Sequence, residues 1–90
     1  MDFSDQIAII TGSSAGIGQA AAIGMAEGGA KLVINYSKSA EAAEKVVAAC
    51  KAAGGDAIAV KADVSDDADC KKLVEAAIDE WGRLDILVNN

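Results

Sequence analysis

The sequence predicts an α/β fold: a doubly wound parallel sheet of four strands, in the order 3-2-1-4, with three helices packed on it. Short apolar runs alternate with helical patterns, and each helical pattern ends in glycine. Strands that alternate with helices lie parallel and are joined by right-handed crossovers. Hydrophobic residues make up 52% of the chain, with one Trp, one Tyr and one Phe, so Ala, Val, Ile and Leu should form a core on both faces of the sheet. The 90 residues predict one small domain, 1–90.

The expected strands are the apolar runs bounded by glycine or polar residues. They cover residues 6–11, 31–36, 57–62 and 84–89. The first helix is expected over residues 16–27, where small residues let it lie close to the sheet, and it ends at Gly28-Gly29. Its sheet-facing side is expected to carry Ile17, Ala20, Ala21, Ile23 and Gly24.

The second helix is expected over residues 40–53, with Ser39 as its N-cap and Gly54-Gly55 as its stop. Its buried side should carry Ala43, Val46, Val47, Cys50 and Ala53. Ser65 is the expected cap of the third helix, and acids in the first turn complement the helix dipole: Asp66, Asp67 and Asp69. Gly82 follows its last turn, and one apolar face at helical spacing should pack on the sheet: Cys70, Leu73, Val74, Ala77, Ile78 and Trp81.

Charge and composition exclude several classes of function. The net charge is −6 and the pI is near 4.3, so we expect neither a nucleic-acid partner nor an anionic membrane surface. The N-terminus is acidic, and no apolar stretch approaches the roughly 18 residues of a membrane span, which predicts a soluble, cytoplasmic protein. Cys50 and Cys70 are not closely paired and are expected to be small buried hydrophobes, and without His no metal site is expected.

The motif Gly12-x-x-x-Gly16-x-Gly18 follows the first strand and opens the first helix. Such motifs use one glycine for the tight turn, one where the backbone passes a pyrophosphate, and one where helix meets strand. Free N–H groups at the helix start, with the hydroxyls of Ser13 and Ser14, would offer donors to phosphate or ribose oxygens. The motif therefore predicts a phosphate-binding turn, and a purely structural turn is the alternative.

Three segments of the chain resemble the short-chain dehydrogenase/reductases, a Rossmann-type family, and look most similar to its 3-oxoacyl-carrier-protein reductases and glucose dehydrogenases. The segments are Thr11-Gly-Ser-Ser-Ala-Gly-Ile-Gly18, Asp63-Val64 and Leu84-Asp-Ile-Leu-Val-Asn-Asn90. The resemblance implies a cofactor loop formed by Thr11, Gly12, Ser13, Ser14, Gly16, Ile17 and Gly18. It also implies that Asp63 and Val64 hold the adenine, and that Asn90, with Asn89 beside it, lines the adenosine side of the cleft.

Position in the sheet supports Asp63 independently of the family. An acid that leaves a parallel strand at its carboxyl end lies where open α/β sheets bind ligands, and its carboxylate can accept a hydrogen bond from the adenine amino group. The alternative for Asp63 is a turn acid, and for Asn89 and Asn90 it is a polar pair at a strand end.

The end of the second strand is expected to select the cofactor, because an acid there binds the ribose diol of NAD and repels the extra phosphate of NADP. Tyr36, Ser37 and Lys38 occupy this position and none is acidic. The Ser37 hydroxyl and the Lys38 ammonium can both bind a phosphate, so we expect NADP(H) to be favoured over NAD(H). Lys38 as a solvated loop charge is the alternative.

No catalytic residue is predicted. The family's catalysis implies a Ser and a Tyr-x-x-x-Lys pair, in which the Lys lowers the Tyr pKa. Tyr36 is the only tyrosine, the residue four positions later is Ala40, and Tyr36 ends a strand, so we do not expect it to act in catalysis.

We therefore expect the NAD(P)(H)-binding half of a short-chain dehydrogenase/reductase, an oxidoreductase of carbonyl or alcohol substrates, with the C-terminal catalytic part absent. It should bind the dinucleotide without transferring hydride alone. In one alternative, the strand at 84–89 is an exposed edge through which the chain forms a homodimer or larger assembly. In the other, the chain is a fragment that regains activity when the catalytic half is added.

Overall fold

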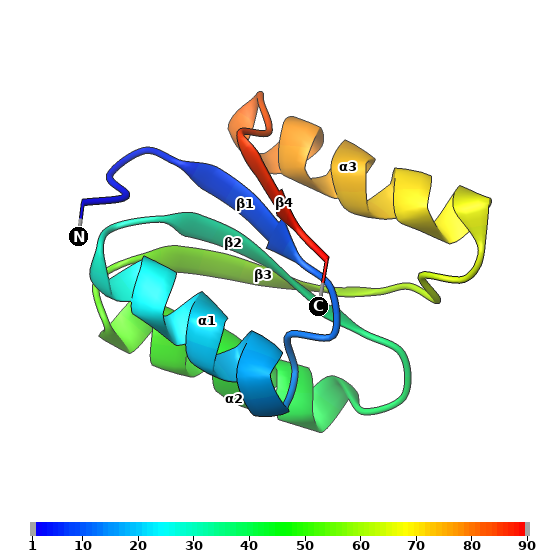
Figure 1. The fold of residues 1–90 in the computed structure, drawn as a ribbon, viewed down its shortest axis with the longest axis horizontal. Helices are drawn as coiled ribbons and strands as arrows, with labels where there is room; N and C mark the ends of the chain where they lie inside the picture. The colour runs from blue at the N-terminus through cyan, green and yellow to red at the C-terminus, as the bar shows by residue number, and fades with distance from the viewer. Residues whose placement is uncertain (1, 90) are drawn as a thin grey trace.

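The computed structural model describes residues 2–89, which form a four-stranded sheet with three helices. The elements in chain order are β1 (Ile7–Ile10), α1 (Gly16–Glu27), β2 (Lys31–Tyr36), α2 (Ala40–Ala52), β3 (Asp56–Lys61), α3 (Asp67–Trp81) and β4 (Ile86–Val88). Neighbouring strands pair in parallel in the order β3-β2-β1-β4 (Figure 1), which confirms the predicted fold class and strand order. No helix within these residues has the length and apolarity needed to cross a membrane.

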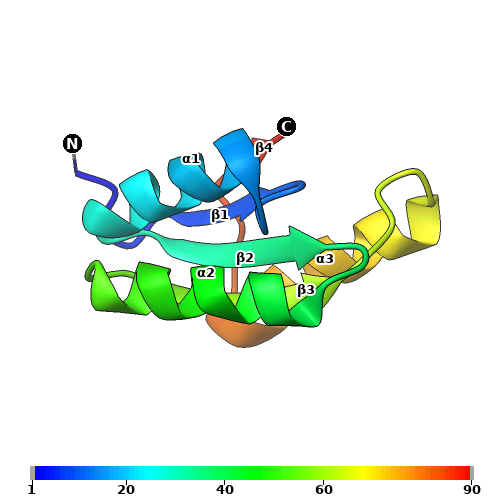
Figure 2. The ribbon, with the colours of Figure 1, turned by 90° about the horizontal axis from the view of Figure 1, so that it is seen from below.

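The helices cover both faces of the sheet. Right-handed crossovers from β1 to β2 to β3 place α1 and α2 on one face, and the return crossover from β3 to β4 places α3 on the other. Figure 1 shows α1 and α2 on one side of the strands and α3 on the other, and in Figure 2, seen from below, α1 and α2 lie in front of α3. The carboxyl ends of the parallel strands therefore meet at one edge, which we call the carboxyl edge.

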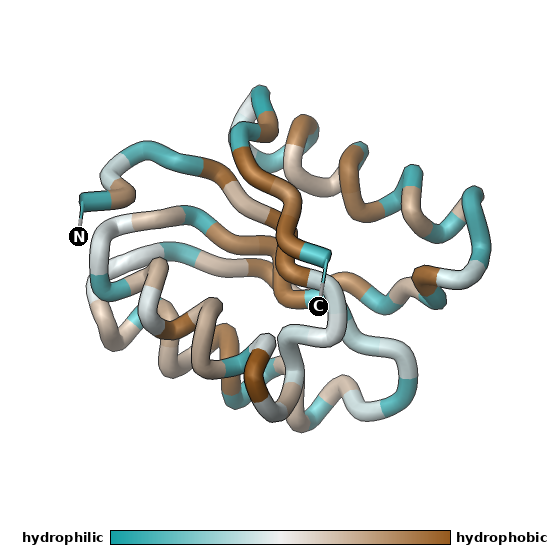
Figure 3. The backbone as a smooth tube through the Cα atoms, viewed as in Figure 1, coloured by the Kyte–Doolittle hydropathy of each residue, from teal (hydrophilic) through white to brown (hydrophobic). Residues whose placement is uncertain are grey.

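The core consists of two layers because successive strand residues point to opposite faces. On β1, Ala8 and Ile10 pack with the α1 and α2 residues, whereas Ile7 and Ile9 pack with α3. All four residues are at most 3% exposed. Figure 3 shows the hydrophobic residues following the strands through the middle of the molecule. Cys50 belongs to the first layer, and burial raises the pKa of its thiol to about 11.

The expected sheet-facing side of α1 was wrong in part. Gly18, Ala22 and Ala26 are buried, at a spacing of four residues, and these small residues let the helix lie close to the strands. Ala21 and Ile23 are only partly buried, and Ala20, Gly24 and Ile17 are exposed, Ile17 by 82%. The helix turns a different side toward the sheet than expected, and this orientation leaves the large apolar side chain of Ile17 in solvent beside the glycine turn.

Helix α3 also differs from the expectation. Leu73 and Ala77 are buried, but Val74 and Ile78 are 40% and 44% exposed because α3 lies over β1 and β2 and the apolar face is wider than that contact. Cys70 is half-buried and its Sγ donates to the carbonyl of Val64, so the expectation of a fully buried thiol was wrong for it.

The predicted cap of α3 was wrong as well. The N-cap is Asp66, whose carboxylate accepts from the N–H of Ala68 at 2.8 Å, and Asp67 and Asp69 lie in the first turn. Ser65 instead donates its hydroxyl to Asp63. The Ser39 cap of α2 is confirmed, since its Oγ accepts from the N–H of Ala42 at 3.1 Å.

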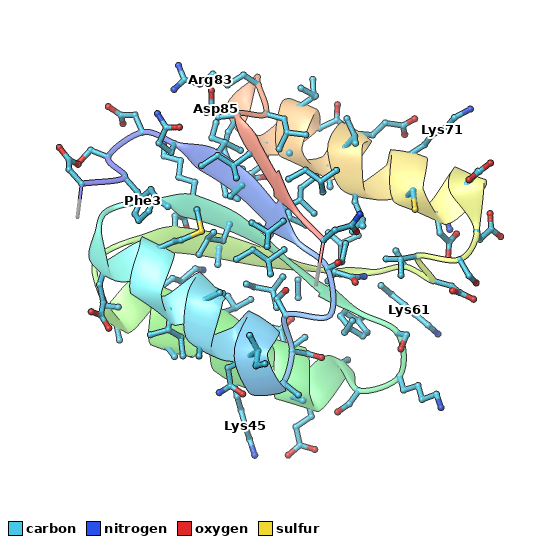
Figure 4. The ribbon with its side chains drawn as sticks, in the orientation of Figure 1. Phe3, Lys45, Lys61, Lys71, Arg83 and Asp85 are labelled. Atoms are coloured by element: carbon cyan, nitrogen blue, oxygen red, sulfur yellow. The ribbon has the colours of Figure 1, made fainter. Side chains whose placement is uncertain are left out.

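Two charged residues close the opposite edge of the sheet, where β1 and β4 begin (Figure 4). The carboxylate of Asp85 accepts from the N–H of Ile7 at 2.9 Å and from Nε of Arg83 at 3.1 Å. The bond from Ile7 and then that from Arg83 hold the pKa of Asp85 below its ordinary value. Arg83 also donates to the carbonyl of Asp5 at 2.7 Å. Arg83 and Asp85 thus join the segment before β4 to the segment that leads into β1.

Gly55 should be essential for the packing of α1 against the start of β3. A Cβ at this position would meet the carbonyl oxygen of Ala30 and the Cα and Cβ of Ala26. Gly55→Ala should lower the free energy of unfolding by about 1–3 kcal/mol, because the backbones must separate. Gly24→Ala is the matched control: its Cβ meets nothing within 4 Å, and helix propensity predicts a gain of about 1 kcal/mol. Urea unfolding of the two variants checks this, and equal stabilities would contradict it.

Candidate functional site

The predicted site residues come together at the carboxyl edge because they follow parallel strands. The glycine turn follows β1, residues 37–39 follow β2, residues 62–66 follow β3, and Asn89 follows β4. Figure 1 shows the segment after β1 turning back into the start of α1 at this edge. Asn90 lies outside the described residues.

Backbone conformation explains two of the glycines in the turn. Gly12 and Gly16 have φ angles of 63° and 61°, in the left-handed region that side chains with a Cβ rarely adopt. A Cβ added to Gly16 would meet no protein atom within 4 Å. Packing within the protein therefore does not require the absence of a side chain at Gly16, and the space beside it is open.

The start of α1 differs from the starts of the other two helices. Ser39 and Asp66 cap α2 and α3 with their side chains, whereas the N-cap of α1 is Ala15, which makes no side-chain cap bond. The first turn of α1 also contains no acid. Its N–H groups and the positive end of its dipole thus face the exposed glycine turn, where they favour an anion.

The hydroxyl residues of the turn are not equally accessible. Thr11 is buried, and both its N–H and its Oγ1 donate to the carbonyl of Val88, at 3.1 and 3.4 Å. Ser13 is 0% exposed, and its Oγ accepts from the N–H of Asn35 at 2.9 Å. The expectation that the Ser13 hydroxyl is presented to a ligand was therefore wrong, because this hydroxyl is buried and hydrogen-bonded to the backbone of Asn35 on β2. Ser14 is half-buried and stays a candidate donor.

Asn35 is the residue of this edge that sequence reasoning missed. It is 3% exposed, near the end of β2, and its Oδ1 accepts from the N–H of Gly12 at 3.0 Å. Its Nδ2 donates to the carbonyls of Ala62 at 3.0 Å and of Tyr36 at 3.4 Å. The signal was present in the sequence: Asn35 is an uncharged polar residue inside an apolar strand, and buried polar groups need partners.

Asp63 lies directly after the Ala62 carbonyl that Asn35 holds. Its Oδ1 accepts from the hydroxyl of Ser65 at 2.6 Å and from the N–H of Ser65 at 2.9 Å. These two bonds, the hydroxyl first, hold the pKa of Asp63 below its ordinary value of 3.8. Its own N–H donates to Asp69 at 2.8 Å. Asp63 is therefore an exposed, ionised carboxylate fixed at the carboxyl edge.

The segment after β2 is open to solvent. Tyr36 is half-buried at the last position of the strand, and Ser37 and Lys38 are exposed. Within residues 2–89, Lys38 makes no hydrogen bond or ion pair. No group of three His, Cys, Asp or Glu side chains in this range is placed to hold a metal ion.

A pocket of about 270 Å³ connects three of the predicted residues on the α3 side of the edge. It is lined by Ile9, Thr11, Val64, Cys70, Leu73, Val74, Leu87 and Asn89. Val64, which follows Asp63 in the sequence, is 48% exposed, and most of the lining is apolar, so the pocket can accept an apolar group.

Comparison with known proteins gives one consistent family. A family model described as short chain dehydrogenase matches residues 6–90. An uncharacterized oxidoreductase of Methylorubrum extorquens is 53% identical over 85 residues, which are 94% of this chain and 34% of that protein. A 3-oxoacyl-[acyl-carrier-protein] reductase of Synechocystis sp. is 46% identical over 85 residues, with the same shares. The chain thus spans about a third of the length of these curated relatives.

Solved structures agree in fold. A short-chain dehydrogenase/reductase from Serratia marcescens superposes with a TM-score of 0.94 at 40% identity, covering 100% of this chain and 37% of that one. The NADH-dependent reductase A1-R', solved in complex with NAD, gives a TM-score of 0.89 at 33% identity, covering 97% and 36%.

Removal of the Ser65 hydroxyl should raise the pKa of Asp63. Because the folded pKa lies below 3.8, the ionised form stabilises the fold above that pH, and the contribution is lost as the pH falls through the folded value. Ser65→Ala should bring the Asp63 pKa toward 3.8 and shrink this acid-dependent stability. Titration of the carboxyl carbons by NMR measures the change, with Asp85 as the internal control that should not move. An unchanged Asp63 titration would contradict the assigned cause.

Proposed function

The chain belongs to the short-chain dehydrogenase family, and we propose that the carboxyl edge of its sheet binds the diphosphate and adenosine of NAD(P)(H). The observation that carries the proposal is the start of α1. There, an uncapped helix N-terminus opens onto a left-handed glycine with free space around it. The longer protein of this family would act as an oxidoreductase on carbonyl or alcohol substrates.

The diphosphate is assigned to the glycine turn on electrostatic and steric grounds. Amides at the helix start and the helix dipole favour negative charge, and the bare backbone at Gly16 admits a phosphate at close range. The predicted cofactor loop lies here: Thr11, Gly12, Ser13, Ser14, Gly16, Ile17 and Gly18. Within it, Thr11 donates to the Val88 carbonyl, and the Ser13 Oγ and the Gly12 N–H are bound to Asn35. The proposed ligand donors are therefore the hydroxyl of Ser14 and the amides that follow it.

The adenosine is assigned to the segment after β3. Asp63 is an exposed carboxylate, and the next residue, Val64, lines the apolar pocket together with Asn89. Oδ1 is used by Ser65, while Oδ2 makes no bond within residues 2–89 and can accept from an adenine amino group. The predicted contribution of Asn89, which lines the pocket, belongs to this side of the proposed site, and that of Asn90, outside the described residues, stays a prediction.

For the cofactor we propose NADP(H) over NAD(H). The relevant position, residues 36–38, contains no acid, and the exposed Lys38 ammonium is not committed to a carboxylate in the described residues. A ribose phosphate placed there would gain a charge-assisted contact.

These 90 residues are proposed to bind the dinucleotide without transferring hydride. Tyr36 ends β2, and the residue four positions later, Ala40, begins α2, so the Tyr-x-x-x-Lys pair of the family is not formed. The cytoplasmic location and activity after complementation by a catalytic half stay predictions.

Self-association through β4 is the second proposal that an observation favours. Within the described sheet β4 pairs only with β1, and Leu87 on it is 59% exposed. An exposed apolar edge strand is a template for pairing with another chain.

Gly16→Ala should weaken dinucleotide binding, whereas its matched control Gly82→Ala should not. The two substitutions should lower the free energy of unfolding by similar amounts. Both Gly16 and Gly82 have left-handed φ angles, 61° and 83°, and neither has an atom within 4 Å of an added Cβ. Alanine at either position should cost about 1–2 kcal/mol of strain. Gly82 ends α3, away from the carboxyl edge. Only Gly16→Ala should lower the NADPH affinity, by about tenfold or more, in calorimetric titrations. Equal affinities of the two variants, or no binding by the unsubstituted chain, would contradict the proposal.

Lys38→Ala should reduce the affinity for NADPH by about three- to tenfold and leave that for NADH unchanged, because only NADPH has the second phosphate. Lys51→Ala, in the last turn of α2, is the control with the same change of net charge. Parallel titrations of both variants with both cofactors provide the comparison. A loss of NADH affinity of the same size, or an effect of Lys51→Ala as large, would show that Lys38 does not select the cofactor.

A further inference from the structure

The buried amide of Asn35 connects two segments that lie far apart in the sequence. Oδ1 accepts from the N–H of Gly12, after β1, and Nδ2 donates to the carbonyl of Ala62, after β3, both at 3.0 Å. The backbone N–H of Asn35 adds a third link, to the Oγ of Ser13 at 2.9 Å. One residue of the central strand β2 thus fixes the chain on both of its neighbours.

The two ends of this bridge are the anchors of the two proposed subsites. Gly12 is the first residue of the glycine turn, and its N–H is turned inward to Asn35. Ala62 directly precedes Asp63, whose N–H is in turn fixed by Asp69. The side chain of Asn35 thus links the two proposed subsites directly, beside the backbone bond from the N–H of Ala62 to the carbonyl of Tyr36 at 2.9 Å.

The chemistry of the bridge requires an amide. It needs an acceptor toward Gly12 and a donor toward Ala62 at the same time, from a side chain that is 3% exposed. An aspartate provides the acceptor and cannot donate when ionised, and an alanine provides neither. Every buried side-chain N or O within residues 2–89 has a partner. Loss of the Gly12 bond would leave the Oδ1 of Asn35 unpaired, and loss of the Ala62 bond would leave its Nδ2 only the longer bond to the Tyr36 carbonyl, at 3.4 Å.

We propose that Asn35 is a positioning residue: it links the glycine turn to the Asp63 segment and so holds the diphosphate and adenine subsites at the separation that a dinucleotide requires. This inference rests on the proposed function for its ligand. The link itself is a property of the ligand-free chain and is tested separately.

The link is tested by amide hydrogen exchange in three variants of the 90-residue chain. Asn35→Asp keeps the acceptor, so the Gly12 amide should stay protected while the Asp63 amide exchanges about tenfold faster or more. Asn35→Ala should accelerate exchange at both Gly12 and Asp63. Val33→Ala, a buried neighbour on β2, controls for general loss of stability, and the Ile7 amide, held by Asp85 at the opposite edge, reports it. If Asp63 exchanges in Asn35→Asp as it does in the unsubstituted chain, or only in step with Ile7, the link is refuted.

The positioning role is tested by calorimetric titration of the same proteins with NADPH. Asn35→Asp should bind about tenfold more weakly, whereas Val33→Ala, corrected for its folded fraction, should bind like the unsubstituted chain. Equal affinity of Asn35→Asp and the unsubstituted chain would overturn the role. If the unsubstituted chain binds neither NADPH nor NADH, the proposed function fails, and the exchange data alone then decide whether Asn35 links Gly12 to Asp63.

Discussion

The arrangement of the carboxyl edge depends on one buried side chain, the amide of Asn35. A parallel sheet with right-handed crossovers brings the ends of its strands to one edge, but it does not fix the loops that follow. Asn35 does so by hydrogen bonds to Gly12 and Ala62, on the two strands beside its own. The bond to Ala62 is buried and the bond to Gly12 is part-buried, so the amide of Asn35 joins the two loops largely out of contact with water.

The two edges of the sheet have different roles. At the edge where β1 and β4 begin, the charged groups of Asp85 and Arg83 form hydrogen bonds with the backbone of Ile7 and Asp5. At the carboxyl edge Asn35 and Ser13 are buried and hold the loops from within, while the amides at the start of α1, the Asp63 carboxylate and Lys38 face solvent. The carboxyl edge therefore exposes donors and charges of the kinds that phosphate and adenine need.

The alternation of apolar runs and helical patterns was enough to predict the fold class and the strand order. It placed the ends of the elements to within about two residues, the largest difference being β4, Ile86–Val88 instead of 84–89. The sheet-facing side of α1 could not be predicted, because the Ala, Gly and Ile residues of this helix are distributed on all its sides and none of the sides is clearly more apolar than the others. The α3 cap was ambiguous, because Ser65, Asp66 and Asp67 can all cap a helix. The burial of Ser13 and the role of Asn35 depend on contacts between β1, β2 and β3, which no local pattern contains.

The most direct test of the account is an NMR titration of the chain with NADPH, followed by the amide signals of each residue. The account predicts the largest shifts at residues 12–18, 36–38 and 63–64, which are distant in sequence and adjacent only at the carboxyl edge. No shifts at saturating NADPH, or shifts centred on the exposed Val74 and Ile78 of α3, would contradict it.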